Sequence, residues 1–462
     1  MATVDPPKPG TSLSDDTKKL VDKPAPKAVT ELRQECGSLG FLKGAAPKDE
    51  SVPQKMLNLP AAWRANPDLE HNKGAGIKIA VIDTGVNRNP RLDVQPGGDY
   101  VSNADGTDDC DGHGTFVAGL IAAKPSPDDS LVGVAPDAQI IAIRQVSDHF
   151  QAKDQNGDKP PGSMSKEGYG PPETLAAAVV HAVNMDADII NISETSCTAA
   201  NSPTGDDDLG VAVRYAFEKG RVVVVAAGNT GTNSNCSTPN GEYSDSKTSW
   251  DNVHTVASPA WFSPYVLTVG SVNRFGDASS FTLYGPWVDV AAIGEGAVSL
   301  DSKSTTGGVI DSMLGDKGQP VPIPGTSFST PLVSGLAALL KAKHTDWSPR
   351  EIMNQIILTA HQPGTGRNDR IGAGAIDPVA ALSQDFPLDV LNAENPVLPV
   401  HAGSDQPHAL PTPLKPDGPP RLPRLVATVG SLVCLAALGI GLAVSIPFRR
   451  RRHDDELPDL DS

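Results

Sequence analysis

The chain has 462 residues, of which 39% are hydrophobic and 20% charged, and its formal net charge is −17 at pH 7. This length and apolar content are sufficient for one large buried core with accessory segments. The excess of acidic residues argues against nucleic acid as a partner, because nucleic-acid-binding domains carry basic surfaces. The sequence has no P-loop and no GxGxxG turn between a strand and a helix, so nucleotide chemistry has no support either.

Residues 1–55 form a proline-rich segment with few apolar side chains. Five prolines lie among lysines and aspartates, namely Pro6, Pro7, Pro9, Pro24 and Pro26. A segment of this composition cannot bury enough apolar surface to fold as an independent domain. We therefore expect an extended arm that depends on the domain after it.

The first strong strand pattern is the apolar run at residues 77–82, which lies between Gly76 and Gly85 and is followed by Asp83. An apolar run of this kind is typical of a strand buried inside a parallel sheet. Binding crevices of open α/β sheets lie at the carboxyl ends of the strands. Asp83 is therefore predicted to lie in such a crevice.

His113 begins the next helical pattern, an apolar segment at residues 116–123. Gly112 and Gly114 allow the backbone to turn sharply on either side of the histidine. The imidazole is therefore predicted to project from the N-terminus of a helix.

Strand and helix patterns then alternate along the chain, as right-handed crossovers in a parallel sheet require. The predicted strands are residues 139–143, 188–192 and 221–228, and the predicted helices are residues 174–185 and 209–218. The sequence therefore predicts a doubly wound α/β fold with a parallel sheet.

Two further polar residues follow such patterns. Asn229 comes directly after the valine-rich strand, and Ser327 opens a long helical pattern after the turn made by Pro324 and Gly325. A serine hydroxyl becomes a nucleophile when an imidazole takes its proton, and a carboxylate must fix the tautomer of that imidazole. Ser327, His113 and Asp83 would fill these roles. The Asn229 amide and the Ser327 N–H would form the oxyanion hole.

Each motif alone has a simpler interpretation. The Asp-Thr-Gly at 83–85 also occurs in aspartic peptidases, which need two such loops in one chain or in a dimer, and this chain has no second copy. The His113 segment alone would be a surface turn, Gly325 to Ser327 alone a helix cap, and Asn229 alone the end of a strand. Their joint occurrence favours a serine peptidase.

The motifs VIDTG, DGHGT, AAGN and GTSFSTP occur in this order and resemble those of the subtilisin-like serine peptidases, the subtilases. The resemblance covers residues 56–385 and implies the subtilisin type of fold. Phe116 departs from the family pattern, as do Ser329 and Thr330, but none of the three has a catalytic role. The resemblance also implies that the substrate cleft is lined by Ser193, Ala226, Ala227 and Gly228. We expect no metal and no cofactor. Residues 154–158 superficially resemble a calcium loop, but the glycine and the terminal glutamate of such a loop are missing from their required positions.

The C-terminal part of the chain predicts where the protein lies in the cell. Residues 386–424 are rich in proline and predict an extended linker. Residues 425–448 contain no charged side chain and, as a helix, are long enough to cross a bilayer. Four arginines follow, at 449–452, so the tail 449–462 is predicted to be cytoplasmic and the peptidase domain extracytoplasmic.

The cysteines agree with export. Cys434 lies within the predicted span, and four others lie outside it and allow three pairings. We favour Cys197 with Cys236, since both follow adjacent predicted strands, which leaves Cys36 for Cys110. The second bridge would attach the N-terminal arm three residues before His113.

The arm, the proposed Cys36 to Cys110 bridge, the linker, the C-terminal span and residues 56–63 together resemble the mycosins, the membrane-anchored subtilases of actinobacterial type VII secretion systems. Within this resemblance, the polar insert at residues 146–172 is similar to a loop that flanks the active site. The resemblance implies a protein or peptide substrate and the type VII secretion membrane complex as a partner. Two functions are compatible with it: an endopeptidase, or a structural stabiliser of that complex whose protease activity is secondary or inhibited.

Overall fold

The computed structural model describes residues 4–37, 39–40, 48–65, 69, 71–153, 163–165, 168–231, 236, 238–241, 250–315, 317–364, 366–396 and 430–443. The chain divides into two compact units, Met1–Pro399 and Val400–Ser462.

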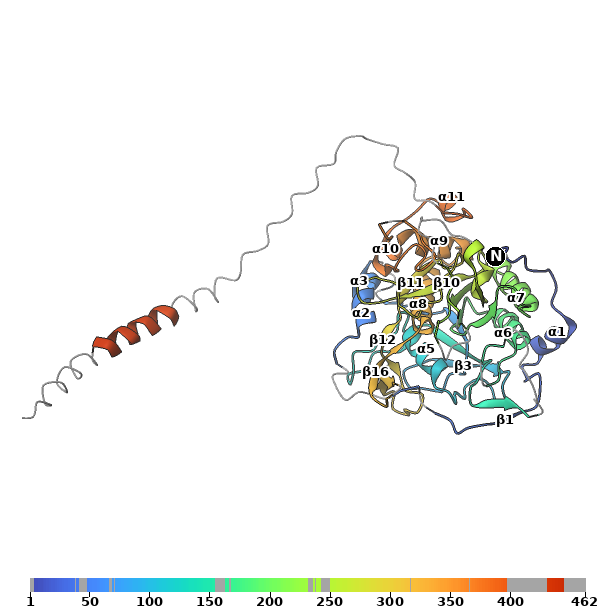
Figure 1. Ribbon diagram of the computed structural model, residues 1–462, viewed down its shortest axis with the longest axis horizontal. Coiled ribbons are helices and arrows are strands. Elements are labelled where there is room, and N and C mark those ends of the chain that lie inside the picture. Colours follow the sequence, from blue (N-terminus) through green and yellow to red (C-terminus); the bar gives the residue numbers. More distant parts are fainter. Residues whose placement is uncertain are drawn as a thin grey trace, which may run out of the picture. The chain divides into compact units, whose positions relative to one another are not determined.

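A seven-stranded sheet forms the centre of the first unit (Figure 1), and all of its strand pairs are parallel. The strand order is β11-β10-β8-β6-β2-β4-β3. The strands are β2 (Lys78–Asp83), β3 (Val94–Asp99), β4 (Gln139–Arg144), β6 (Ile189–Ile192), β8 (Val222–Ala226), β10 (Leu267–Val272) and β11 (Val290–Ile293). The predicted parallel α/β sheet is thus confirmed.

Helices cover both faces of this sheet because successive strand residues point to opposite sides. In β2, Ile79 and Val81 enter one core cluster, and Ala80 and Ile82 enter the other. The first cluster includes residues of α5 (His113–Ala122) and α8 (Thr326–Lys343). The second includes residues of α6 (Pro172–Asn184) and α7 (Asp207–Glu218). Strands apolar on both faces therefore follow from a sheet that is buried on both sides.

Smaller elements surround this core. The further helices are α1 (Asp15–Asp22), α2 (Val52–Leu57), α3 (Leu59–Arg64), α9 (Pro349–Thr359), α10 (Pro378–Ser383) and α11 (Leu388–Leu391), with the short 3₁₀ turns η1 (Trp250–Asn252) and η2 (Ala260–Phe262). The further strands are β1 (Thr30–Leu32), β5 (Phe150–Ala152), β7 (Ser196–Ala199), β9 (Thr255–Ser258), β12 (Glu295–Ala297), β13 (Ser299–Leu300), β14 (Val309–Ile310), β15 (Ser312–Leu314) and β16 (Pro320–Pro324). All of these strands form antiparallel pairs.

The N-terminal arm is attached to the rest of the first unit at several points. Ser14 caps α1, and Ser14 and Thr17 both donate hydrogen bonds to the Asp208 carboxylate on α7. Strand β1 pairs with β5, which lies in the insert that the sequence predicted as a long loop. The arm is therefore held by side chains and by main-chain pairing together.

In the second unit, residues 430–443 form a helix whose large apolar side chains are exposed. Within the described residues, no helix combines the length and the apolar character that crossing a bilayer requires. Both ends of the predicted span, residues 425–429 and 444–448, lie outside the described residues, as do the predicted tail and most of the predicted linker.

Candidate active site

Asp83 and His113 are hydrogen-bonded to each other at the carboxyl end of β2. The Asp83 Oδ1 atom lies 2.7 Å from His113 Nδ1 and also accepts a hydrogen bond from the Thr84 N–H at 2.8 Å. The Asp83 side chain is fully buried, and its Oδ2 atom has no partner among the described residues. A carboxylate beside Nδ1 holds the proton on that nitrogen, so the lone pair of the neutral ring lies on Nε2.

Two glycines allow this approach. Gly112 has a φ of 86°, a left-handed conformation that side chains other than glycine rarely adopt. A Cβ atom at Gly114 would lie 2.0 Å from the carbonyl oxygen of Gly85, a sterically impossible contact. Helix α5 can therefore begin at His113, directly against the strand end that carries Asp83.

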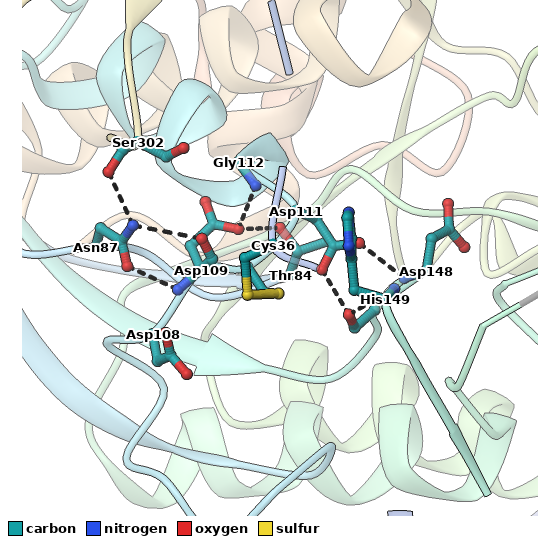
Figure 2. Close-up of a disulfide and its surroundings, with 12 residues drawn as sticks. Cys36, Thr84, Asn87, Asp108, Asp109, Asp111, Gly112, Asp148, His149 and Ser302 are labelled. Atoms are coloured by element: carbon teal, nitrogen blue, oxygen red, sulfur yellow. Dashed lines mark hydrogen bonds between the residues drawn. A yellow bond between two sulfur atoms is a disulfide. The ribbon is translucent and has the colours of Figure 1, made fainter. Parts of the chain in front are cut away.

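A buried carboxylate, Asp109, organises the loop before His113 (Figure 2). Its Oδ1 atom accepts hydrogen bonds from the Thr84 hydroxyl at 2.8 Å and the Gly112 N–H at 2.7 Å. Its Oδ2 atom accepts from the Thr115 N–H at 2.8 Å and the Thr115 hydroxyl at 2.6 Å. Burial raises the pKa of Asp109 to about 6, although these hydrogen bonds lower it. Sequence reasoning missed this residue.

Ser327 is the second residue of α8 and is half-buried. The residue before it, Thr326, donates hydrogen bonds from its N–H and its hydroxyl to Asn229 Oδ1, at 2.9 and 3.1 Å. The residue after it, Phe328, has its ring centroid 5.4 Å from that of His113. The two chain neighbours of Ser327 thus contact Asn229 and His113. Pro331 follows four residues later and has no N–H to donate to the Ser327 carbonyl.

The residues expected to line the substrate cleft lie at the ends of β6 and β8. Ser193 is buried and accepts a hydrogen bond from Asn191 Nδ2 at 3.0 Å. Ala226 accepts one from the Thr195 hydroxyl at 3.1 Å, Gly228 donates its N–H to the Thr326 hydroxyl at 3.3 Å, and Ala227 is buried between them. Their roles toward a substrate stay a prediction.

The structure places a second carboxylate near the imidazole. Glu194 Oε1 lies 3.5 Å from His113 Nδ1. Burial by itself lowers the pKa of His113, but the Asp83 charge, and after it those of Glu194 and Asp109, raise the pKa of the imidazole well above its usual value. Burial raises the pKa of Glu194, the His113 charge lowers it, and the Asp83 charge raises it further. Sequence reasoning missed Glu194, although a carboxylate two residues after a predicted strand end could have signalled it.

Asp83, His113 and Glu194 also offer ligand atoms within 4.8 Å of one another, a spacing that is compatible with a metal ion. The 2.7 Å separation between Asp83 and His113 is that of a hydrogen bond. Ligands of tetrahedral zinc, each about 2.0–2.2 Å from the ion, lie more than about 3 Å apart. The cluster therefore fits a hydrogen-bonded acid–base group better than a metal centre.

Two disulfides flank this site. Cys36 is joined to Cys110, three residues before His113, and Cys197 is joined to Cys236. The fifth cysteine, Cys434, is free and exposed on the 430–443 helix. One bridge thus attaches the N-terminal arm beside the histidine, and the other attaches the start of β7 to the segment after Asn229.

A parallel α/β sheet with an Asp–His hydrogen bond at its carboxyl edge, and a serine at the start of a helix that packs on that sheet, is the arrangement of a serine peptidase of the subtilisin type. The model of the Subtilase family matches residues 74–374. Mycosin-1 of Mycobacterium tuberculosis (strain ATCC 25618 / H37Rv) is 40% identical over 435 residues, which cover 93% of this chain and 92% of that relative. The chain therefore belongs to the subtilases and, within them, to the mycosins, and it is a subtilisin-like serine endopeptidase.

Solved structures give the same result. The crystal structure of MycP1 from the ESX-1 type VII secretion system is similar with a TM-score of 0.75 and 40% identity, covering 85% of this chain and 99% of that one. A chain in the structure of an intact ESX-5 inner membrane complex is similar with a TM-score of 0.72 and 36% identity, covering 96% of this chain and 99% of that one.

Proposed function

We propose that Ser327 is the nucleophile of this endopeptidase, His113 its general base and acid, and Asp83 the group that orients the imidazole. The 2.7 Å hydrogen bond between His113 Nδ1 and Asp83 Oδ1 carries this proposal. It fixes the tautomer in which Nε2 can accept a proton. The position of Ser327, next in the chain to the residue that contacts the His113 ring, supports its role as the nucleophile.

The reaction follows from these roles. The Ser327 oxygen attacks the carbonyl carbon of the scissile peptide bond while Nε2 of His113 takes the hydroxyl proton. The tetrahedral intermediate breaks down when His113 returns that proton to the leaving amine, which gives an acyl enzyme. Water then attacks the ester with His113 again as the base, and His113 passes the proton to the Ser327 oxygen as the ester bond breaks and the carboxylic acid product leaves. Asp83 stabilises the imidazolium in both halves of the reaction.

We further propose that Asn229 stabilises the oxyanion together with the Ser327 N–H. Because Asn229 Oδ1 accepts two hydrogen bonds from Thr326, the orientation of the side-chain amide beside Ser327 is fixed. A preorganised donor of this kind is typically worth about 100 to 1,000-fold in turnover. The ends of β6 and β8, with Ser193 and residues 226–228, are proposed to hold the substrate backbone in the cleft.

A fluorophosphonate probe that reacts with activated serines tests the enzymatic roles. We expect the full chain to be labelled and Ser327→Ala to give no label, with Asn229→Ala labelled much more slowly. The Ser202→Ala variant is the control, since Ser202 is an exposed serine outside this group of residues. Equal labelling of the wild type and Ser327→Ala would remove Ser327 from the mechanism.

We also propose that the enzyme acts outside the cytoplasm, anchored by residues 425–448 and associated with a type VII secretion membrane complex. The uncharged stretch followed by four arginines supports the anchor. Similarity over 96% of this chain to a component of the ESX-5 inner membrane complex supports the partner. We expect the full chain to stay in the membrane fraction after alkaline carbonate extraction and a chain ending at residue 424 to be released. Release of both would contradict the anchor.

A structural role in that complex is the second candidate, and the same similarity favours it. Secretion by a deletion strain complemented with Ser327→Ala separates the two functions. Restored secretion would show that the folded chain is required for its structural role. Failed secretion with an intact complex would show that catalysis is required.

A further inference from the structure

We propose that Glu194 is a positioning residue that acts through His113 and sets the lower pH limit of catalysis. The inference rests on the proposed role of His113 as the base. It adds a fourth side chain to the three of the triad, and this side chain belongs to none of the motifs that indicated a peptidase.

The geometry places two carboxylates on one nitrogen. His113 Nδ1 lies 2.7 Å from Asp83 Oδ1 and 3.5 Å from Glu194 Oε1. The Glu194 side chain is 22% exposed and that of His113 is 16% exposed. Screening by water is therefore weak, and an ionised Glu194 acts on the imidazole at short range.

The backbone around Glu194 is held on both sides. Before it, Ser193 is buried and hydrogen-bonded to Asn191, which in turn accepts a hydrogen bond from the Ser334 hydroxyl on α8. After it, the Thr195 hydroxyl donates to the carbonyl of Ala226 at 3.1 Å, and β7 begins at the next residue. The disulfide of Cys197 anchors the same strand. The carboxylate is thus presented to His113 by fixed structure.

The charged groups that face this pair come from several elements. Asp83 ends β2 and Asp109 lies in the loop before α5, and both act on His113. Asp111 and Asp148 act on Glu194. From α8 the contact with the imidazole is the apolar ring of Phe328. These four charged groups around the pair are all acidic.

The direction of the effect follows from the charge. An ionised Glu194 stabilises the imidazolium, but His113 accepts the serine proton only as the neutral base. The enzyme must therefore reach a higher pH before His113 is neutral. The same carboxylate stabilises the imidazolium that forms in the transition state, so it also increases the rate once the base is free.

The test is the second-order rate of fluorophosphonate labelling of the full chain, measured from about pH 5 to 10. In Glu194→Gln, the midpoint of the acidic limb should shift down by about 1 pH unit or more, and the rate at the high-pH plateau should fall. Glu194→Asp keeps a carboxylate, so its midpoint should lie between those of the wild type and Glu194→Gln. Asp128→Asn removes an exposed carboxylate outside the site and should leave the midpoint unchanged.

A purely structural Glu194 would lower the plateau without moving the midpoint, and that result would overturn the inference. The titration of the His113 ring, followed by NMR in the Ser327→Ala background with and without Glu194→Gln, separates this inference from the proposed function. Failure of labelling in the wild type would reject the proposed nucleophile, whereas the NMR titration would still report whether Glu194 acts on His113. Equal His113 titrations in the two NMR samples would reject the role of Glu194.

Discussion

Two buried side chains, Asp109 next to Cys110 and Asn240 four residues after Cys236, each organise a loop near a disulfide, but with different chemistry. Asp109 organises the loop before His113 through four hydrogen bonds to its carboxylate. Asn240 organises the segment after Cys236: its Oδ1 atom accepts from the N–H groups of His254 and Thr255, and its Nδ2 atom donates to the carbonyls of Thr255 and Tyr284. Each residue is 4% exposed.

The difference between them is charge. An amide both donates and accepts, so Asn240 can join two strands of main chain that offer N–H and C=O groups. The groups around Asp109 all donate, so they require an acceptor and favour the ionised carboxylate. The stability of the loop around Asp109 is therefore sensitive to pH, whereas that of the segment around Asn240 is not.

Removal of the Asp109 carboxylate should have the largest effect on stability and activity among the variants that test this comparison. In Asp109→Ala, the buried N–H groups of Gly112 and Thr115 lose their acceptors. We expect the free energy of unfolding to fall by about 4 kcal/mol and labelling of Ser327 to fall at least about tenfold, because His113 follows this loop directly. Denaturant unfolding and labelling rates measure both effects. A loss below about 1 kcal/mol would show that the loop does not depend on Asp109.

The pH dependence of the unfolding free energy distinguishes Asp109 from Asn240 more sharply. Burial raises the pKa of Asp109 from 3.8 to about 6, so in this window the folded state binds a proton that the unfolded state has lost. Stability contributed by this group is therefore highest below about pH 4 and decreases by up to about 3 kcal/mol as pH rises through 6. The difference in unfolding free energy between the wild type and Asp109→Asn should change across this window. A constant difference from pH 4 to 7 would contradict the shift.

Asn240→Ala should have a smaller effect that is independent of pH. It removes two donors and one acceptor that serve buried main-chain groups, so we expect a loss of about 2 to 3 kcal/mol. The loss should be equal at pH 4 and pH 7, since no titrating group is removed. A loss that varies with pH in parallel with that of Asp109→Asn would remove the proposed distinction.

Asn87→Ala should give the smallest change. Asn87 accepts from the Asp109 N–H at 2.7 Å and donates to the carbonyls of Asp109 and Ser302, as Figure 2 shows, but it is only half-buried. Water can replace these partners, so we expect a loss of about 1 kcal/mol. Thermal unfolding beside Asn240→Ala provides the comparison, and a loss as large as that of Asn240→Ala would show that burial does not decide the effect.

Local patterns were sufficient to predict much of the fold. The runs at residues 77–82 and 221–228 indicated buried parallel strands because both faces of such strands are apolar, and β2 and β8 lie there. The long helix was predicted from its apolar pattern, although α8 begins at Thr326 and continues through Pro331. The small antiparallel pairs, such as β1 with β5, could not be predicted, since short strands are defined by distant partners.

The role of Glu194 depends on neighbours in space. Strand β6 lies beside β2 in the sheet, with Ile192 opposite Ile82, so the residues that follow the two strands meet at one edge. In the sequence, Asp83 and Glu194 are separated by two other strands of the sheet, β3 and β4. No motif around Glu194 predicts that its carboxylate reaches the His113 imidazole.

The sequence by itself determined the kinds of element and their alternation, and it predicted the candidate reactive side chains, because periodicity, glycine positions and short motifs are local properties. The tertiary structure alone decided how many carboxylates lie near the imidazole, and which buried groups organise the loop before His113 and the segment after Cys236. Those facts depend on strand order and on loop closure. Electrostatic interactions act through space, so groups far apart in the chain set the protonation of His113.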